Sequence, residues 1–299
     1  MPTEIPPEPG TETGARLEVR KTYKLFIGGG FPRSESGRSY PVHDHAGRFL
    51  ANAAHASRKD ARDAVVAARK AFPGWSSKTG YHRGQILYRV AEVLESRRAQ
   101  LAEEVDRCEG AGRRQAETTV DLTVDRLVWY AGWADKIGQV VGGANPVAGP
   151  YFNFSTPDPT GVVAVVAPQD SSLLGLVSVL APVVVTGNTA VMVTSHQRPL
   201  PGITLAEVLA TSDVPGGVVN LLTGPTAEIA PWLASHLDVN AVDLTGVTDP
   251  DLARTLEEAA ADNLKRVIRP AASDWTADPG IERMTTFLET KTVWHPIGT

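Results

Sequence analysis

The chain is almost free of cysteine. Cys108 is the single cysteine among 299 residues, which excludes an intramolecular disulfide framework and a cysteine-rich metal site. This usage is typical of a reducing compartment, so we expect a cytoplasmic protein. The seven histidines are scattered, and no spacing of histidine, cysteine and aspartate predicts a metal site.

A strong charge of one sign and a long apolar run are also missing. The net charge of -5 gives no support to a nucleic-acid partner or an anionic membrane. Residues 161–186 are the most apolar stretch, but Pro168 and Pro182 interrupt it, so no continuous membrane span is expected. Residues 1–16 lack the basic start and apolar run of a secretory signal and are predicted to be a disordered tail.

The first part of the chain has the pattern of a helical region. Residues 24–31 alternate and then reach three glycines, which predicts a short strand and hairpin. Ser57 and Asp60 have the spacing of a capping box at the start of a helix. Apolar residues at helical spacing predict two further helices, over about residues 82–108 and 113–137.

From residue 140 onward the pattern becomes that of extended structure. Glycines and the alternating sequence YFNFS predict an extended β-hairpin arm over residues 140–158. Five short apolar runs then alternate with helical segments, at residues 161–167, 189–193, 218–222, 241–245 and 264–268. Strands separated by helices pair in parallel through right-handed crossovers. The sequence therefore predicts an α/β fold with a Rossmann-type, doubly wound parallel sheet.

Several blocks of the chain resemble one enzyme family. KLFIGGGF, the stretch SRKDARDAVVAARKAFPGW, DRLVWYAGWADKI, GPYFNFSTPDPTGVVAVVAP, LAPVVVTGNTAVMV, DVPGGVVNLLTGP and LTGVTDP resemble, in order and spacing, the N-terminal half of NAD(P)-dependent aldehyde dehydrogenases. This resemblance covers roughly residues 20–268. FLETKTVWHPIG, near the C-terminus, resembles the tail that joins the family's oligomerisation arm.

The resemblance implies a domain organisation. A cofactor-type Rossmann domain with N-terminal helices is expected over residues 17–138 and 159–270, and the oligomerisation arm over residues 139–158 and 283–299. The catalytic domain that lies between these parts in the family is missing, because only about 20 residues separate them.

The catalytic positions implied by the resemblance are changed as well. Cys108 does not match the nucleophile motif and is interpreted as a small packing residue. Asp170 stands where the family has an asparagine that stabilises the oxyanion, and an ionised acid would repel that charge. The alternative is that Asp170, with Ser171 and Ser172, caps the next helix. Pro270 stands in place of the family's glutamate base.

The resemblance also identifies the positions that hold the cofactor ribose and pyrophosphate. Val193 replaces the lysine, and His196, expected in a surface loop, replaces the glutamate of the ribose site. Ala230 stands for a glycine at a helix start, where a methyl group would crowd the pyrophosphate.

The remaining positions of the cofactor site keep only part of the family pattern. Val247 replaces a serine, although backbone amides there would still suit an anion. Pro168, Thr245 and Gly246 match the family and are interpreted as vestiges of the site. We therefore expect no cofactor, with weak NAD(P) binding as the alternative.

These replacements favour a non-catalytic, structural role. The leading hypothesis is a pseudoenzyme that forms a hetero-oligomer with a full-length aldehyde dehydrogenase through its arm and helices. The first alternative is a divergent oxidoreductase that acts on aldehydes and still binds NAD(P). The second is a regulatory module that senses a ligand in the cleft near Asp170, His196 and Thr245.

Overall fold

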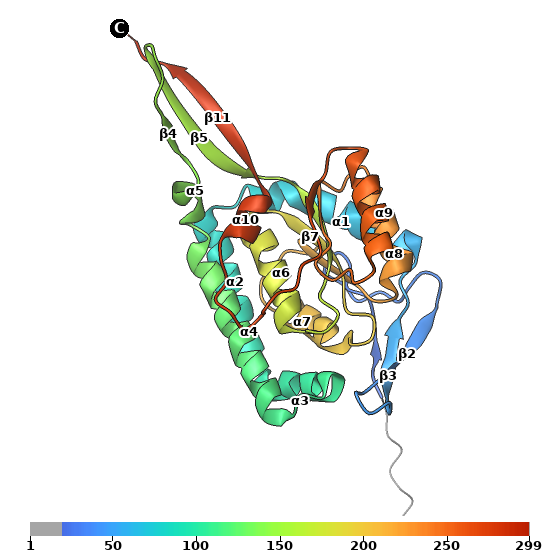
Figure 1. Ribbon diagram of the computed structural model, residues 1–299. Coiled ribbons are helices and arrows are strands. Elements are labelled where there is room, and N and C mark those ends of the chain that lie inside the picture. Colours follow the sequence, from blue (N-terminus) through green and yellow to red (C-terminus); the bar gives the residue numbers. More distant parts are fainter. Residues whose placement is uncertain (1–19, 299) are drawn as a thin grey trace, which may run out of the picture.

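A computed structural model describes residues 20–298 of the chain, and the tail predicted for residues 1–16 lies outside this range. A five-stranded sheet lies at the centre, helices cover both of its faces, and a three-stranded arm projects from one end (Figure 1). The expected α/β class with a parallel sheet is confirmed.

The central sheet is formed by the strands that the alternating pattern predicted. Its order is β10-β9-β6-β7-β8, and every pair is parallel. The strands are β6 (Val162–Val166), β7 (Thr189–Val193), β8 (Val219–Leu222), β9 (Ala241–Asp243) and β10 (Arg266–Ile268). All residues of β6 and β7 are buried, as expected for parallel strands that helices cover on both faces.

Helices divide between the two faces of this sheet. On one face lie α6 (Leu174–Val185) and α7 (Leu200–Ala210), whose buried residues belong to one apolar cluster. On the other lie α1 (Arg58–Ser76), α8 (Thr226–Ala234) and α9 (Pro250–Ala261), which supply a second cluster. The capping box of Ser57 and Asp60 at the start of α1 is confirmed.

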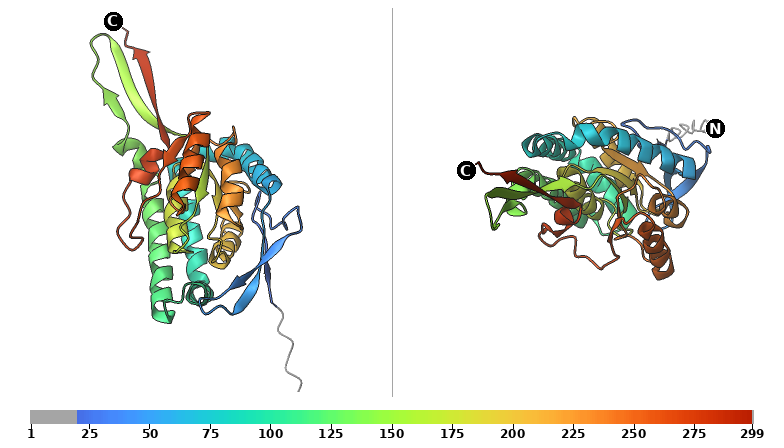
Figure 2. Two further views of the ribbon diagram at one scale, coloured as in Figure 1. Left: turned by 45° about the vertical axis from the view of Figure 1, so that its right-hand side comes forward. Right: turned by 90° about the horizontal axis from the view of Figure 1, so that it is seen from above.

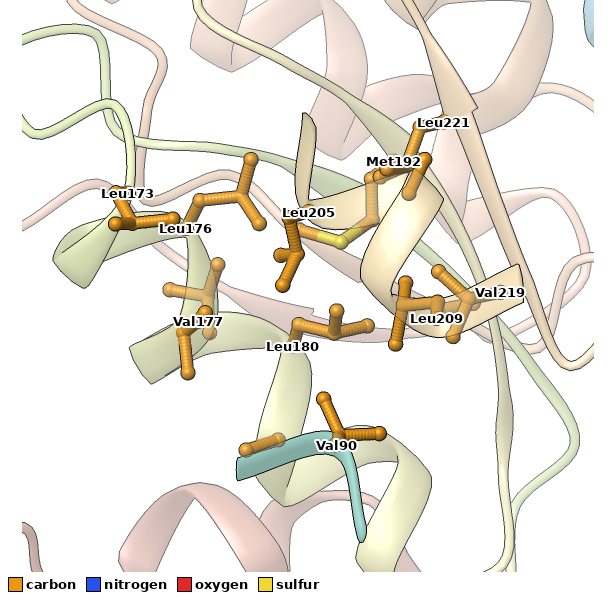
Figure 3. Close-up of a cluster of buried hydrophobic side chains, with 14 of the residues drawn as sticks. Val90, Leu173, Leu176, Val177, Leu180, Met192, Leu205, Leu209, Val219 and Leu221 are labelled. Atoms are coloured by element: carbon orange, nitrogen blue, oxygen red, sulfur yellow. The ribbon is translucent and has the colours of Figure 1, made fainter. Parts of the chain in front are cut away.

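The core under α6 and α7 is closely packed. Figure 3 shows Leu205 of α7 beside Met192 of β7, with Leu176 and Leu180 of α6 facing them. Leu205 and Met192 are 1% and 0% exposed. Their burial fixes α6 and α7 on the sheet, and with them the loops at its carboxyl edge.

The expected helix over residues 82–108 is wrong as a single element. The structure has α2 (Gly80–Ser96) and α3 (Arg98–Glu109), with a change of direction at Arg97. Arg97 forms an ion pair with Glu207 of α7 at 3.1 Å, and α3 packs against α4 and α7. These tertiary contacts account for the break between α2 and α3, although the helical spacing of apolar residues continues through it.

The next predicted helix also ends earlier than expected. Helix α4 covers Arg113–Trp133, and a short α5 (Ile137–Val140) follows at the base of the arm. Trp129 packs against Trp133, with 5.6 Å between ring centroids.

The N-terminal strands were only partly predicted. Residues 24–31 form no hairpin of two strands; instead Phe26 makes an antiparallel bridge to Leu221 of β8, and Ile27 bridges Gly30 in a tight turn. A small sheet of β1 (Thr22–Tyr23), β2 (Ser39–His43) and β3 (Phe49–Ala54) was not foreseen. The alternation of buried and exposed residues in these strands is irregular, since the register of the β2–β3 pairing shifts between Val42 and His43.

The arm joins two segments that lie far apart in the sequence. Strand β5 (Tyr151–Pro159) pairs with β4 (Gly143–Asn145) on one side and with β11 (Leu288–Pro296) on the other, both antiparallel. In the left view of Figure 2 this sheet extends away from the helical body.

The segment between β10 and the arm is fastened to the body. Arg126 of α4 donates to the carbonyl oxygens of Trp275 and Ala277 at 2.8 and 2.9 Å. Arg283, on α10 (Glu282–Thr286), donates to the carboxylate of Asp243 at 2.6 Å and to the Thr245 hydroxyl at 3.0 Å. The Asp243 side chain is 0% exposed, so Arg283 neutralises a buried charge.

Replacing Leu205 with alanine should lower the free energy of unfolding by about 2–5 kcal/mol, because a cavity would remain in the core. Urea denaturation measures the change. Leu237→Ala is the control; Leu237 is 76% exposed, so its loss should change stability by less than about 0.5 kcal/mol. Equal effects of the two substitutions would contradict this account of the core.

Arg283→Ala should lower the free energy of unfolding by about 3–5 kcal/mol, because it leaves the buried Asp243 carboxylate unpaired. Burial raises the pKa of Asp243, and Arg283 opposes that rise. Without Arg283 the pKa of Asp243 rises further and the ionised form costs more, so the loss should grow as the pH is raised.

Arg266→Ala provides the matched control for this pair. The Arg266 and Glu289 side chains are 37% and 53% exposed, and the loss of such a pair should cost less than about 1 kcal/mol. A pH-independent effect of Arg283→Ala would show that the Asp243 charge is not the cause.

Candidate functional site

A hollow of about 440 Å³ lies at the carboxyl edge of the central sheet. It collects residues that follow β6, β9 and β10: Pro168, Gln169, Asp170, Thr245, Gly246, Val247, Thr248, Pro270, Ala271, Ala272, Ser273 and Trp275. The structure thus brings together six of the positions singled out in the sequence. Three others, Val193, His196 and Ala230, do not line it.

Asp170 is the one titratable side chain among the described residues that line this hollow. Of the three residues expected to cap the next helix, only Ser171 does so: its hydroxyl oxygen accepts from the amide of Gly175, in the first turn of α6, at 2.9 Å. Within residues 20–298 no hydrogen bond joins the Asp170 carboxylate to α6, so the expectation is wrong for Asp170. The Asp170 backbone carbonyl is held by Arg198 at 2.8 Å, while its carboxylate lies exposed at the mouth of the hollow.

The turn after β9 is fixed by internal contacts. A Cβ atom at Gly246 would lie 1.9 Å from the carbonyl oxygen of Ala167, so only glycine allows this turn to approach the end of β6. The Gly246 amide donates to the Val166 carbonyl at 3.0 Å, and the Thr245 hydroxyl is occupied by Asp243 and Arg283. Gly246 and Thr245 therefore both have structural roles.

The backbone amides of this turn have partners inside the protein. Thr245 N donates to the Asp243 carboxylate at 2.9 Å, and Val247 N donates to the Leu244 carbonyl at 2.9 Å. Val247 itself is 4% exposed and packs in the core. We expected these backbone amides to suit an anion, but the amides of Thr245, Gly246 and Val247 all donate to acceptors within the protein.

The two positions expected near the ribose are buried or covered. Val193 is 0% exposed and belongs to the apolar cluster under α1, α8 and α9. The His196 ring packs against Tyr40 of β2 in a tilted arrangement, with 4.7 Å between ring centroids, and the Tyr40 hydroxyl donates to the His196 carbonyl at 3.1 Å. His196 is thus partly buried rather than a free surface residue. Burial and the neighbouring His55 lower the pKa of His196.

The start of α8 differs from the interpretation made from the sequence. Ala230 is 3% exposed and faces the core, so the expectation that its methyl group crowds a ligand is wrong. Glu228 is the acidic residue of the first turn, and its carboxylate lies 2.9 Å from His55 Nε2. A negative side chain at this helix start disfavours a second anion there.

Gln169 has a role that the sequence did not reveal. Its amide nitrogen donates to the Ala167 carbonyl at 2.8 Å, and its amide oxygen accepts from the His196 amide at 3.0 Å. Its own carbonyl accepts from the Ser195 hydroxyl at 3.0 Å. Gln169 therefore ties the loops after β6 and β7 together. Nothing in the sequence pattern indicated this, because the bonds join loops far apart in the chain.

Cys108 lies away from the hollow. Its side chain is 3% exposed, on α3. Burial, followed by the charges of Glu104 and Glu109, raises the pKa of the thiol to about 12. A thiol with this pKa is almost fully protonated at neutral pH and is a poor nucleophile.

Metal-binding side chains are spread apart within residues 20–298. No three side chains of the histidine, cysteine, aspartate and glutamate types come together there in a way that could hold an ion. None of the helices in this part of the chain combines the length and the apolar character that crossing a bilayer requires.

Residues 31–270 match the sequence model of the aldehyde dehydrogenase family. Retinal dehydrogenase 2 from Gallus gallus is 36% identical over 259 residues, which cover 84% of this chain and 48% of that protein. A putative aldehyde dehydrogenase, DhaS, from Bacillus subtilis (strain 168) is 33% identical over 263 residues, covering 84% and 51% of the two chains.

Solved structures show the same relationship. HpcC from Thermus thermophilus has a TM-score of 0.78 and 29% identity, over 83% of this chain and 47% of that one. An NAD+ complex of aldehyde dehydrogenase from Bacillus cereus also has a TM-score of 0.78, with 28% identity, over 83% and 50% of the chains. This chain spans about half the length of the relatives it matches. It belongs to the aldehyde dehydrogenase family.

Proposed function

We propose that the protein is a non-catalytic member of its family that assembles with a full-length aldehyde dehydrogenase. The arm is the observation that carries this proposal. Although only residues 269–287 separate β10 from β11, the arm has all three strands, and β11 pairs with β5 over nine residues. A C-terminal strand that only completes the arm is expected to be retained when the arm itself has a function.

The exposed side chains of the arm support this role. Tyr151, Phe152, Trp294 and Ile297 are between 44% and 58% exposed. Large apolar side chains at a protruding sheet are typical of a surface that a partner covers. Strand β11 is also an edge strand whose outer side has no partner in the part of the chain described, so it can accept a strand of another subunit.

The hollow at the carboxyl edge supports the non-catalytic part of the proposal. Its lining includes the carboxylate of Asp170 but no thiol, and Pro270 offers no group that can accept a proton. Cys108 is buried on α3. A cytoplasmic location remains part of the proposal and rests on the single cysteine.

Co-expression with the full-length aldehyde dehydrogenases of the same cell should yield a stable complex, because the open edge of β11 can pair with a strand of the partner. Size-exclusion chromatography with light scattering gives its mass. Phe152→Lys with Trp294→Lys should abolish the complex, since both side chains are at least half exposed on the arm.

The matched control places the same charges elsewhere. Tyr88 and Leu237 are 52% and 76% exposed on other elements, so Tyr88→Lys with Leu237→Lys should leave the complex intact. A protein that stays monomeric beside every such dehydrogenase would refute the assembly proposal.

A second candidate is an oxidoreductase that retains NAD(P). Its support is that similar structures, the Bacillus cereus aldehyde dehydrogenase and PnpE, are complexes with nicotinamide adenine dinucleotide. Three observations argue against it: Val193 is buried, Tyr40 packs against the His196 ring, and the acidic Glu228 lies at the start of α8.

We expect no saturable binding of NAD or NADP below about 1 mM in calorimetric titration, which corresponds to less than about 4 kcal/mol of binding free energy. The Bacillus cereus aldehyde dehydrogenase is the positive control. Micromolar binding would favour the oxidoreductase over the non-catalytic subunit.

A further inference from the structure

A second hollow, of about 560 Å³, lies between the start of α1 and the end of α8. Its lining residues are Glu35, Ser57, Arg58, Lys59, Arg62, Trp232, Ser235 and His236. It shares no lining residue with the hollow at the carboxyl edge. Its volume is within the range of small-molecule sites, about 300–1,000 Å³.

Arg58 is held in an unusual way in this hollow. Its guanidinium carbon lies 3.9 Å from the centroid of the Trp232 indole ring. Within residues 20–298 no carboxylate or other acceptor pairs with Arg58. A stacked guanidinium keeps its five N–H donors at its edges. The Trp232 ring therefore orients a cation whose hydrogen-bonding capacity is unused.

Two more cations line the same hollow, and each of them pairs with one carboxylate. Lys59 Nζ lies 3.6 Å from Glu35, which also accepts from the Ser57 hydroxyl at 2.9 Å. Arg62 pairs with its exposed neighbour Asp63 at 2.8 Å. Such exposed pairs are weak and exchange readily for a better anion. With Arg58 unpaired, the hollow has an excess of positive charge.

Two neutral polar residues, Ser235 and His236, also line this hollow. His236 Nδ1 accepts from the Asp238 amide at 3.1 Å, so the proton of the neutral ring lies on Nε2. The Ser235 hydroxyl donates to the Pro231 carbonyl at 2.8 Å. The α1 amides of Lys59 and Asp60 donate to Ser57, so the attraction for an anion comes from side chains rather than from the helix start.

We propose that this hollow binds a small organic phosphate, whose phosphoryl group is held by Arg58 and Arg62 and whose flat organic part lies against Trp232. Arginine forks match the spacing of phosphoryl oxygens and bind them in pairs. The indole is 41% exposed, so a planar group has apolar surface to cover. A bare phosphate ion would use the cations but leave this surface and most of the volume empty.

Calorimetric titration of the full chain tests the proposal with phenyl phosphate, inorganic phosphate and phenol as probes. Phenyl phosphate should bind most tightly, because it alone uses both the cations and the indole. Arg58→Ala with Arg62→Ala should weaken its binding by at least about tenfold, the equivalent of one lost charged hydrogen bond. Trp232→Ala should weaken phenyl phosphate more than inorganic phosphate.

The control variant removes the same charge elsewhere. Arg89 and Arg254 have exposed side chains paired with Glu92 and Asp251, so Arg89→Ala with Arg254→Ala should leave the affinity within about twofold, as expected for distant charges screened by salt. Circular dichroism confirms that each variant folds. Absence of saturable binding, or an equal loss in both double variants, would overturn the proposal. Neither result bears on assembly through the arm.

Discussion

The buried carboxylate of Asp243 is the constraint on which the C-terminal part of the structure depends. Its side chain is 0% exposed at the end of β9, and Arg283 supplies the opposite charge from α10. An unpaired charge at this depth would cost several kcal/mol, so the α10 segment has to return to the sheet. Once it does, Phe287 and Leu288 are buried, and β11 begins at the base of the arm. The same pair thus neutralises the sheet edge and directs the last strand.

The turn at Gly246 shows how packing can account for residues that match a family motif. The pair Thr245-Gly246 matches the family pattern, and its residues fit tightly here: the glycine against Ala167 and the threonine between Asp243 and Arg283. Packing alone explains both residues. A matching motif is therefore weak support for a ligand when its polar atoms are already occupied.

Much of the fold was predictable from the sequence, because β6 to β10 are short apolar runs and their helices supply buried faces. The break at Arg97 and the sheet of β1, β2 and β3 were not, since an ion pair with Glu207 and long-range pairing decide them. In the site, the sequence singled out Asp170 and Pro270, and the structure places both in the lining of one hollow. Ala230 is buried and Tyr40 packs against His196. Both facts depend on the directions of side chains, which the spacing of residues in the sequence does not reveal.

The pairing of β5 with β11 has a consequence for how the molecule forms. The hydroxyl oxygens of Ser155 and Thr292 lie 2.9 Å apart across these strands, although 137 positions separate the two residues in the chain. Strand β11 follows every strand of the central sheet in the chain, and the N-terminal parts of a chain fold first during synthesis. During synthesis the Rossmann body can therefore fold while β5 still lacks its partner strand. The β5–β11 pair then forms after the central sheet, so the exposed edge of β11 is complete only when the rest of the described fold is in place.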